Sequence, residues 1–175
     1  MVLVHYHRNM IREQGNTVGS RSQVDLAYIA GFLDGDGSLM IQLKRRSESK
    51  LKTIRVMLTI CFYQDSRHEK PLHWIKEVLG IGYISHRNDG MTELRINGHK
   101  QVLQILEGLQ PFLKFKEKQA AAIINSAQLL LEVGSNKTVM KEKLVDNIMI
   151  VQSENYVTRR KRSKEELRSI LGLTP

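Results

Sequence analysis

The chain has 175 residues, which is enough for one domain with a substantial core or for one domain with appended helices. Lysine and arginine number 27 against 18 acidic residues, and the resulting net charge of +9 favours a polyanionic partner. One cysteine excludes an intramolecular disulfide, and no apolar stretch has the length of a membrane span or of a signal-peptide core.

These properties predict an intracellular protein that has no membrane partner. We expect it in the cytoplasm if the source is a prokaryote, and in an organelle or the nucleus otherwise. Residues 1–21 have no regular hydrophobic period. We interpret them as an N-terminal arm that is flexible or becomes ordered only on binding.

A helix is predicted after this arm, because Ser22 and Asp25 offer capping side chains and an apolar segment follows them. At helical spacing, small residues and one acid share a stripe that consists of Ala27, Ala30, Gly31 and Asp34. Large apolar residues form a second stripe, so the helix is expected to be buried on both sides. We predict that the small stripe packs against the same helix of a second copy, about a two-fold axis.

Two glycines surround an acid at the end of this helix. Gly35 and Gly37 are expected to turn the chain outward and to leave Asp36 where the two helices meet. A core helix needs no second acid beyond its end. A buried core helix that ends in a turn is the simpler alternative, which the presence of Asp36 disfavours.

The rest of the chain alternates between strand and helix patterns. Segments with alternating apolar and polar residues predict strands at residues 38–46, 53–63, 83–87 and 91–97. A polar turn joins the first two, and Asn88-Asp89-Gly90 predicts a short hairpin between the last two. Helical spacing predicts helices at residues 67–79, 99–108, 116–131 and 138–151, with a short one near the C-terminus.

The order α-β-β-α-β-β-α predicts an α+β fold in which a four-stranded antiparallel sheet has helices on one face. We assign the core to residues 22–133 and the extra helices to a C-terminal extension, residues 134–175. The other face of the sheet would then carry mainly polar side chains, namely Ser38, Met40, Gln42, Lys44, Arg46, Arg55, Met57, Thr59, Cys61, Ser85, Arg87, Glu93, Arg95 and Asn97. Since Arg, Lys and Gln reach base edges in a major groove, we interpret this face as a DNA-binding surface. An ordinary solvated sheet face is the alternative.

Residues 29–37 read Ile-Ala-Gly-Phe-Leu-Asp-Gly-Asp-Gly, which resembles the LAGLIDADG signature of the single-motif homing endonucleases. Two further segments, residues 81–83 and 109–114, also resemble segments of that family. The resemblance implies a saddle-shaped sheet laid along double-stranded DNA. It also implies a homodimer that cuts both strands of a long pseudo-palindromic site and leaves 3′ overhangs. Mg²⁺ or Mn²⁺ would be the cofactor, Ca²⁺ would support binding without cleavage, and no small-molecule substrate is expected.

The resemblance also assigns roles at the helix end. It implies that Asp36 binds the metal, with the backbone carbonyl of Gly35 as a candidate additional ligand. Asp34 is the weaker candidate, and the alternative is that it only closes the helix. One carboxylate per subunit is too few for phosphodiester hydrolysis, so two copies of Asp36 are expected to hold metal ions between the two scissile phosphates.

Other catalytic candidates also come from the resemblance. Gln64 and Lys116 match family positions that order the catalytic water and contact phosphate. Strict alternation places Gln64 on the apolar side of its strand, unless that strand ends at Tyr63. The family has a basic residue four positions later, where this chain has His68 with Arg67 beside it, so either side chain is a candidate phosphate contact.

The basic run from Thr158 to Arg162 resembles a family segment that grips the DNA backbone, and we assign DNA contacts to Arg160, Lys161 and Arg162. A solvated tail is the alternative for this run. We assign Trp74 and Tyr83 to core packing. A non-cleaving nucleic-acid-binding protein, such as an intron RNA-splicing maturase or a regulator, is the alternative function. The presence of Asp36 together with Gln64 and Lys116 favours the enzyme.

Overall fold

The computed structural model describes residues 22–45, 54–132, 136–155 and 161–173, and these fold in the predicted order. The elements are α1 (Gln23–Asp36), β1 (Gly37–Arg45), β2 (Ile54–Asp65), η1 (Ser66–His68), α2 (Lys70–Leu79), β3 (Tyr83–His86), β4 (Met91–Asn97), α3 (His99–Leu109), η2 (Gln110–Phe112), α4 (Glu117–Leu131), α5 (Lys137–Glu154) and α6 (Lys164–Ile170). Here η denotes a 3₁₀ helix. The α+β fold class predicted from the sequence is therefore confirmed.

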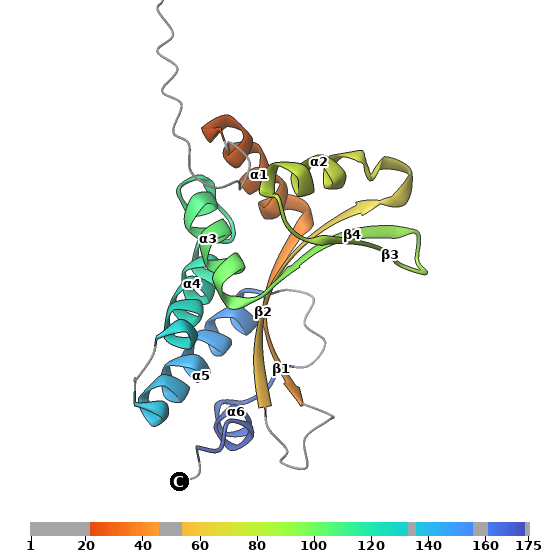
Figure 1. Ribbon diagram of the computed structural model, residues 1–175. Coiled ribbons are helices and arrows are strands. Elements are labelled where there is room, and N and C mark those ends of the chain that lie inside the picture. The colour runs from red at the N-terminus through yellow and green to blue at the C-terminus, as the bar shows by residue number, and fades with distance from the viewer. Residues whose placement is uncertain (1–21, 46–53, 133–135, 156–160, 174–175) are drawn as a thin grey trace, which may run out of the picture.

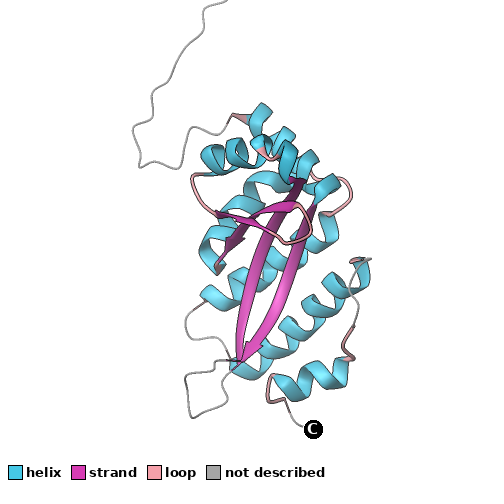
Figure 2. Ribbon diagram, turned by 90° about the vertical axis from the view of Figure 1, so that its right-hand side faces the viewer, coloured by secondary structure: helices cyan, strands magenta, loops and turns pink. Residues whose placement is uncertain are grey.

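The sheet has the strand order β1-β2-β4-β3, and every neighbouring pair is antiparallel. Helices lie behind the sheet when it is viewed as in Figure 2, and the opposite face of the strands is uncovered. The long strands β1 and β2 curve, which gives this uncovered face a concave shape in Figure 1. We call it the open face.

The core lies between the apolar face of the sheet and the helices. Alternate strand residues such as Leu39, Ile60 and Leu94 are fully buried, as the period of two requires. Helix α4 buries Ala120, Ile123, Ile124 and Ala127, which share one face of the helix at the spacing of three to four residues.

Helix α1 begins at the predicted cap, because the Ser22 hydroxyl accepts a hydrogen bond from the backbone N–H of Asp25 at 3.1 Å. Its end depends on Gly37. A Cβ at this position would lie only 2.5 Å from the Leu33 side chain and 2.7 Å from the Leu33 carbonyl oxygen. The absent side chain therefore lets the chain leave the helix and enter β1 immediately after Asp36.

The helix predicted over residues 67–79 is divided into two elements. Residues Ser66–His68 form a 3₁₀ turn, and α2 starts afresh at Lys70 with Pro71 in its first turn, where proline is favoured. Gly80 ends α2 in the left-handed conformation, at φ 68°.

The C-terminal helices pack on the core. The Asn147 amide in α5 donates to the Asn125 side-chain oxygen in α4 at 2.8 Å, and the Asn155 amide donates to the Leu39 carbonyl of edge strand β1 at 3.3 Å. In the part of the chain that the structure describes, no helix combines the length and the apolar character needed to cross a membrane.

Candidate functional site

The two acids at the end of α1 have different environments. The carboxylate of Asp34 accepts backbone N–H groups from Lys114 at 2.7 Å, Phe115 at 3.2 Å and Lys116 at 3.0 Å. This acid therefore ties the end of α1 to the segment before α4, so it does more than close its own helix, and its place at a dimer interface stays a prediction. Asp36, in contrast, is exposed.

Lys116 lies beside these acids, at the N-terminal boundary of α4. Its ammonium donates to the backbone carbonyl of Asp34 at 2.6 Å. Burial lowers the pKa of Lys116, whereas the negative charges of Asp34 and Asp36 act in the opposite direction. The structure thus places a half-buried cation within the electrostatic reach of Asp36, from a segment 80 residues away in sequence.

The small stripe predicted for α1 is only partly on the surface. Ala30 is fully buried inside the subunit, so its predicted place at a dimer interface is wrong. Ala27 and Gly31 are exposed, and a Cβ added to Gly31 would meet no atom within 4 Å. The exposed stripe also includes Val24 and Tyr28, which sequence spacing had not singled out.

The apolar surface of α1 extends in two directions. Tyr28 packs edge-on against Trp74 of α2, with ring centroids 5.3 Å apart, at the mouth of a pocket that also includes Val24 and Pro71. At the other end Phe115 is 82% exposed, next to the site where Asp34 binds its backbone. A phenylalanine within a run of lysines is the sequence signal that could have identified this exposed residue.

The catalytic candidates at the end of β2 are arranged differently from the prediction. Strand β2 continues to Asp65, and Gln64 lies directly opposite the buried Thr92, so it belongs to the helix-covered side. Its side-chain oxygen accepts the backbone N–H of Asp65 at 2.9 Å. The alternative that the strand ends at Tyr63 is wrong. The structure does not bring Gln64 onto the open face.

The two basic candidates after this strand also differ from each other. Arg67 donates to both carboxylate oxygens of Asp65, at 3.0 and 2.8 Å, and these hydrogen bonds hold the pKa of Asp65 well below its usual range. His68 is exposed in the same 3₁₀ turn. The Asp65 carboxylate therefore already holds the Arg67 guanidinium, whereas the His68 side chain is exposed.

Glu69 connects this turn to the sheet. Its carboxylate accepts the Thr92 hydroxyl at 2.6 Å and His86 Nε2 at 2.9 Å, and His73 Nε2 lies 3.6 Å away. These contacts, led by the hydrogen bond from Thr92, lower the pKa of Glu69. One side chain thus joins α2, β3 and β4.

Acid should therefore destabilise the fold through Asp65 and Glu69. Because their pKa values are lowered in the folded state, their stabilising effect is complete above pH about 4, the unfolded value, and disappears as the pH falls through the folded values. We expect Glu69→Gln to lower the melting temperature at pH 7 and to weaken its dependence on pH between 5 and 3. Glu77→Gln, at an exposed position of α2, is the control. Parallel pH profiles for both variants would contradict this expectation.

The open face carries the residues predicted for it, as the strand register shows. Ser38, Cys61 and Arg95 form one row across three strands, and Met40, Thr59 and Asn97 form the next. Tyr63 and Tyr83 also belong to this face, so the assignment of Tyr83 to core packing is wrong; it is 49% exposed. Alternation alone predicts the open face for both tyrosines, but aromatic side chains are usually assigned to the core.

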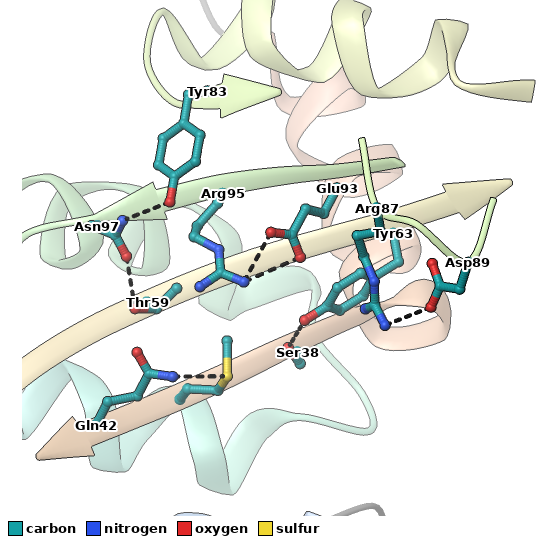
Figure 3. Close-up of polar contacts among 11 residues, drawn as sticks. Ser38, Gln42, Thr59, Tyr63, Tyr83, Arg87, Asp89, Glu93, Arg95 and Asn97 are labelled. Carbon is teal, nitrogen blue, oxygen red and sulfur yellow. Dashed lines mark hydrogen bonds and ion pairs between the residues drawn. The ribbon is translucent and has the colours of Figure 1, made fainter. Parts of the chain in front are cut away.

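Some residues of the open face cannot contact a ligand directly. Thr59 and Cys61 have no exposed surface, so their predicted contact with DNA is wrong. The Thr59 hydroxyl donates to the Asn97 side-chain oxygen at 2.8 Å, and the Asn97 amide donates to the Tyr83 hydroxyl at 3.5 Å (Figure 3). The buried Thr59 thus helps to fix the positions of the more exposed Asn97 and Tyr83 side chains.

Two arginines on this face are held by acids. Arg95 Nη2 lies 2.9 Å from a carboxylate oxygen of Glu93, and Arg87 Nη2 donates to Asp89 at 2.7 Å. Arg87 also lies 6.0 Å from the centroid of the Tyr63 ring, whose hydroxyl is hydrogen-bonded to Ser38 at 3.0 Å (Figure 3). Side chains that would otherwise be mobile are thereby oriented before any ligand binds.

The remaining basic candidates lie near the outer edge of β1. Arg162 lines a pocket together with open-face residues that include Met40 and Lys44, and its backbone N–H donates to the Gln152 side-chain oxygen at 3.0 Å. Lys161 is exposed nearby. Arg46 and Arg160 lie outside the described residues.

Asp36 and the backbone carbonyl of Gly35 supply oxygen ligands, which suit a hard divalent cation such as Mg²⁺, Mn²⁺ or Ca²⁺. Both residues are exposed. Within the ranges that the structure describes, no cluster of three or more His, Cys, Asp or Glu side chains is arranged to hold a metal ion.

The chain is similar to known proteins in both sequence and structure. The sequence profile of the LAGLIDADG endonuclease family matches residues 29–123. DNA endonuclease I-CvuI from Chlorella vulgaris is 34% identical over 124 residues, which span 70% of this chain and 76% of that protein. DNA endonuclease I-CreI from Chlamydomonas reinhardtii is 30% identical over 148 residues, or 83% and 88% of the two chains.

Solved structures of homing endonucleases are also similar to this chain. The crystal structure of I-CvuI in complex with its DNA target in the presence of Ca²⁺ superimposes with a TM-score of 0.75, at 26% identity, over 87% of this chain and 98% of that one. The archaeal intron-encoded homing endonuclease I-Vdi141I, complexed with DNA, has a TM-score of 0.71 at 20% identity, over 85% and 95% of the chains. The second likeness supports the fold alone.

Proposed function

The chain belongs to the LAGLIDADG endonuclease family, and on this premise we propose that it is a homodimeric, metal-dependent homing endonuclease that cuts both strands of a long pseudo-palindromic DNA site. The observation that carries the proposal is the exposed Asp36, with Lys116 beside it, at one end of a concave polar sheet face. A protein that only bound nucleic acid would not need an acid next to phosphate.

DNA would lie along the open face. The curvature of the face and its arginine, lysine and glutamine side chains suit the major groove, where such side chains make bidentate contacts with base edges. Lys161 and Arg162, beside the edge strand, would contact phosphates and contribute affinity without sequence information. We therefore expect binding to weaken steeply as the salt concentration rises.

Cleavage needs a nucleophilic water, neutralised charge on the phosphate and a stabilised leaving oxygen. Asp36 and the Gly35 carbonyl would hold the divalent cation, which supplies Lewis-acid activation when bound. Lys116, anchored on the Asp34 carbonyl, would place a positive charge where negative charge develops on the phosphate. His68 would contact the DNA backbone. Since Gln64 faces the helix-covered side, a role in ordering water requires its side chain to turn.

The second copy of Asp36 would come from a dimer. The exposed stripe of α1, with Ala27, Tyr28 and Gly31, is apolar and contains small residues that permit close helix contact. Phe115 lies at the end of this stripe nearest Asp36 and would be covered by the partner subunit. A two-fold axis through this surface would bring the two acids together.

The direct test uses a library of duplex DNA with randomised half-sites. The protein should select a pseudo-palindromic sequence in Ca²⁺ and should cut the selected duplex in Mg²⁺ or Mn²⁺ but not in Ca²⁺. Binding in both ions without strand breakage in either would support the maturase or regulator. Failure to select any DNA would refute the endonuclease.

Lys116→Met should reduce the single-turnover cleavage rate by about 10²–10³-fold, the typical loss when one charge-stabilising donor is removed. DNA binding should remain close to that of the wild type. Lys118→Met is the matched control, because the Lys118 ammonium points to Glu154 of α5 at 3.3 Å instead of to the acids. Equal losses in the two variants would show that only general positive charge matters.

A further inference from the structure

A buried acid lies in the middle of the proposed DNA-binding surface. Glu93, on strand β4, is only 7% exposed, and its two carboxylate oxygens lie 2.9 and 3.1 Å from Nη2 of Arg95 (Figure 3). A carboxylate repels a polyanionic ligand, and burial of a carboxylate costs free energy unless the carboxylate is paired with a cation. Its position therefore needs an explanation that general attraction to DNA does not provide.

The two side chains of β2 that lie opposite this pair are neutral. Cys61 lies opposite Arg95 and Tyr63 lies opposite Glu93 in the register of β2 and β4. Burial raises the pKa of both the Cys61 thiol and the Tyr63 phenol, so both groups are uncharged at pH 7. Arg95 and Glu93 therefore cancel each other's charge, and the pair adds little to sequence-independent affinity for phosphate.

The guanidinium of Arg95 has donors left for a ligand. Its contacts with Glu93 are made through Nη2, and Nη1 has no hydrogen-bond partner among the described residues, whereas Nε is buried and out of a ligand's reach. An arginine fork recognises guanine by donating to O6 and N7, and a glutamate accepts from the N4 amino group of cytosine. One G·C pair therefore presents acceptors to the arginine and a donor to the glutamate.

We propose that the Glu93–Arg95 pair reads one G·C base pair in each DNA half-site, with Arg95 as the guanine contact and Glu93 as a specificity-determining positioning residue. This inference rests on the proposed function. Arg95 lies in the row of Cys61 and Ser38, and Ser38 is two residues from Asp36. The base pair is thus in the part of the half-site close to the cleavage position.

Glu93 would orient the Arg95 guanidinium and would also discriminate between base pairs. Some base pairs present a hydrogen-bond acceptor where cytosine presents its amino group. The Glu93 carboxylate would then face that acceptor without a donor between them, which is unfavourable when the protein–DNA contact excludes water. Neutral glutamine at this position can turn its amide to donate or to accept. Glu93→Gln should therefore accept wrong base pairs that the wild type rejects.

The experiment compares the wild type, Glu93→Gln and Arg95→Ala in selection from the randomised library in Ca²⁺, with sequencing of the bound DNA. The wild type should prefer guanine at one position per half-site. Arg95→Ala should lose this preference, and Glu93→Gln should reduce it about tenfold at the same position, the low end of the effect of one base contact. Total affinity of Glu93→Gln for duplex DNA should be unchanged or higher.

Asp89→Asn is the matched control, since it removes the acid from the exposed Arg87 pair instead. It should leave the preference at the Arg95 position intact. An unchanged preference in Glu93→Gln, or changes at different positions in Glu93→Gln and Arg95→Ala, would overturn the inference. If Glu93→Gln proves unfolded by thermal melting, Glu93→Asp, which keeps the charge but shortens the reach, must show the same loss.

Failure of the inference is distinguishable from failure of the proposed function. A wild-type protein that selects and cuts a site, with its base preference insensitive to Glu93, refutes only the role of the pair. A wild-type protein that selects no DNA refutes the function itself.

Discussion

Asp36→Asn should abolish cleavage of the selected duplex in Mg²⁺, with a loss of at least about 10³-fold, and should leave binding in Ca²⁺ within a few-fold of the wild type. The substitution keeps the size of the side chain and removes the anionic oxygen that a hard cation needs. Asp36 is exposed, and the Asp34 carboxylate makes the structural contacts at this end of α1, so the fold should not change.

Single-turnover cleavage and equilibrium binding, measured with the same duplex, check this expectation. Asp146→Asn is the control, because it makes the same chemical change at an exposed ion pair on α5. Loss of binding together with a lower melting temperature would assign Asp36 a structural role. Full activity would exclude it from the metal site.

Gly31→Leu should convert the dimer to monomers and abolish double-strand cleavage. A Cβ at this exposed position would meet no atom of its own subunit within 4 Å, so the fold of the subunit should tolerate the change. At a two-fold interface the added group appears twice, and overpacking costs about 1–3 kcal/mol for each copy. The two copies together cost about 2–6 kcal/mol, so the dissociation constant of the dimer should increase by about 30-fold to about 20,000-fold.

Sedimentation analysis over a range of protein concentrations measures this effect. Ala121→Leu places the same side chain at an exposed position of α4 and should leave the dimer intact. A Gly31→Leu protein that still dimerises would show that the interface lies elsewhere. A monomeric wild-type protein would refute the premise of the test.

Periodicity predicted most of the fold because the apolar face of the sheet needs a strict alternation. It was less reliable on α1, where residues on several sides are apolar. There the sequence could not show that Ala30 faces the core while Val24 and Tyr28 face outward. Which side of such a helix is buried depends on the surfaces that it meets, and these come from distant parts of the chain.

The predicted site shows the same limit. Alternation correctly placed Thr59 and Cys61 on the polar face, but it could not show that their neighbours cover them completely. The role of Asp34 was not predictable either, since its partners are backbone groups 80 or more residues away. The predicted side of the sheet for Gln64 depended on where its strand ends, and sequence patterns locate strand ends poorly.

The Asp34 contacts place an unusual demand on the connection that leads into α4. Surface connections generally tolerate inserted or deleted residues, but here three successive backbone N–H groups bind one carboxylate, and the last of them belongs to Lys116. A change of even one residue in the length of this segment would shift the lysine out of register with the acid. We therefore expect its length to be invariant among active relatives while its exposed side chains vary.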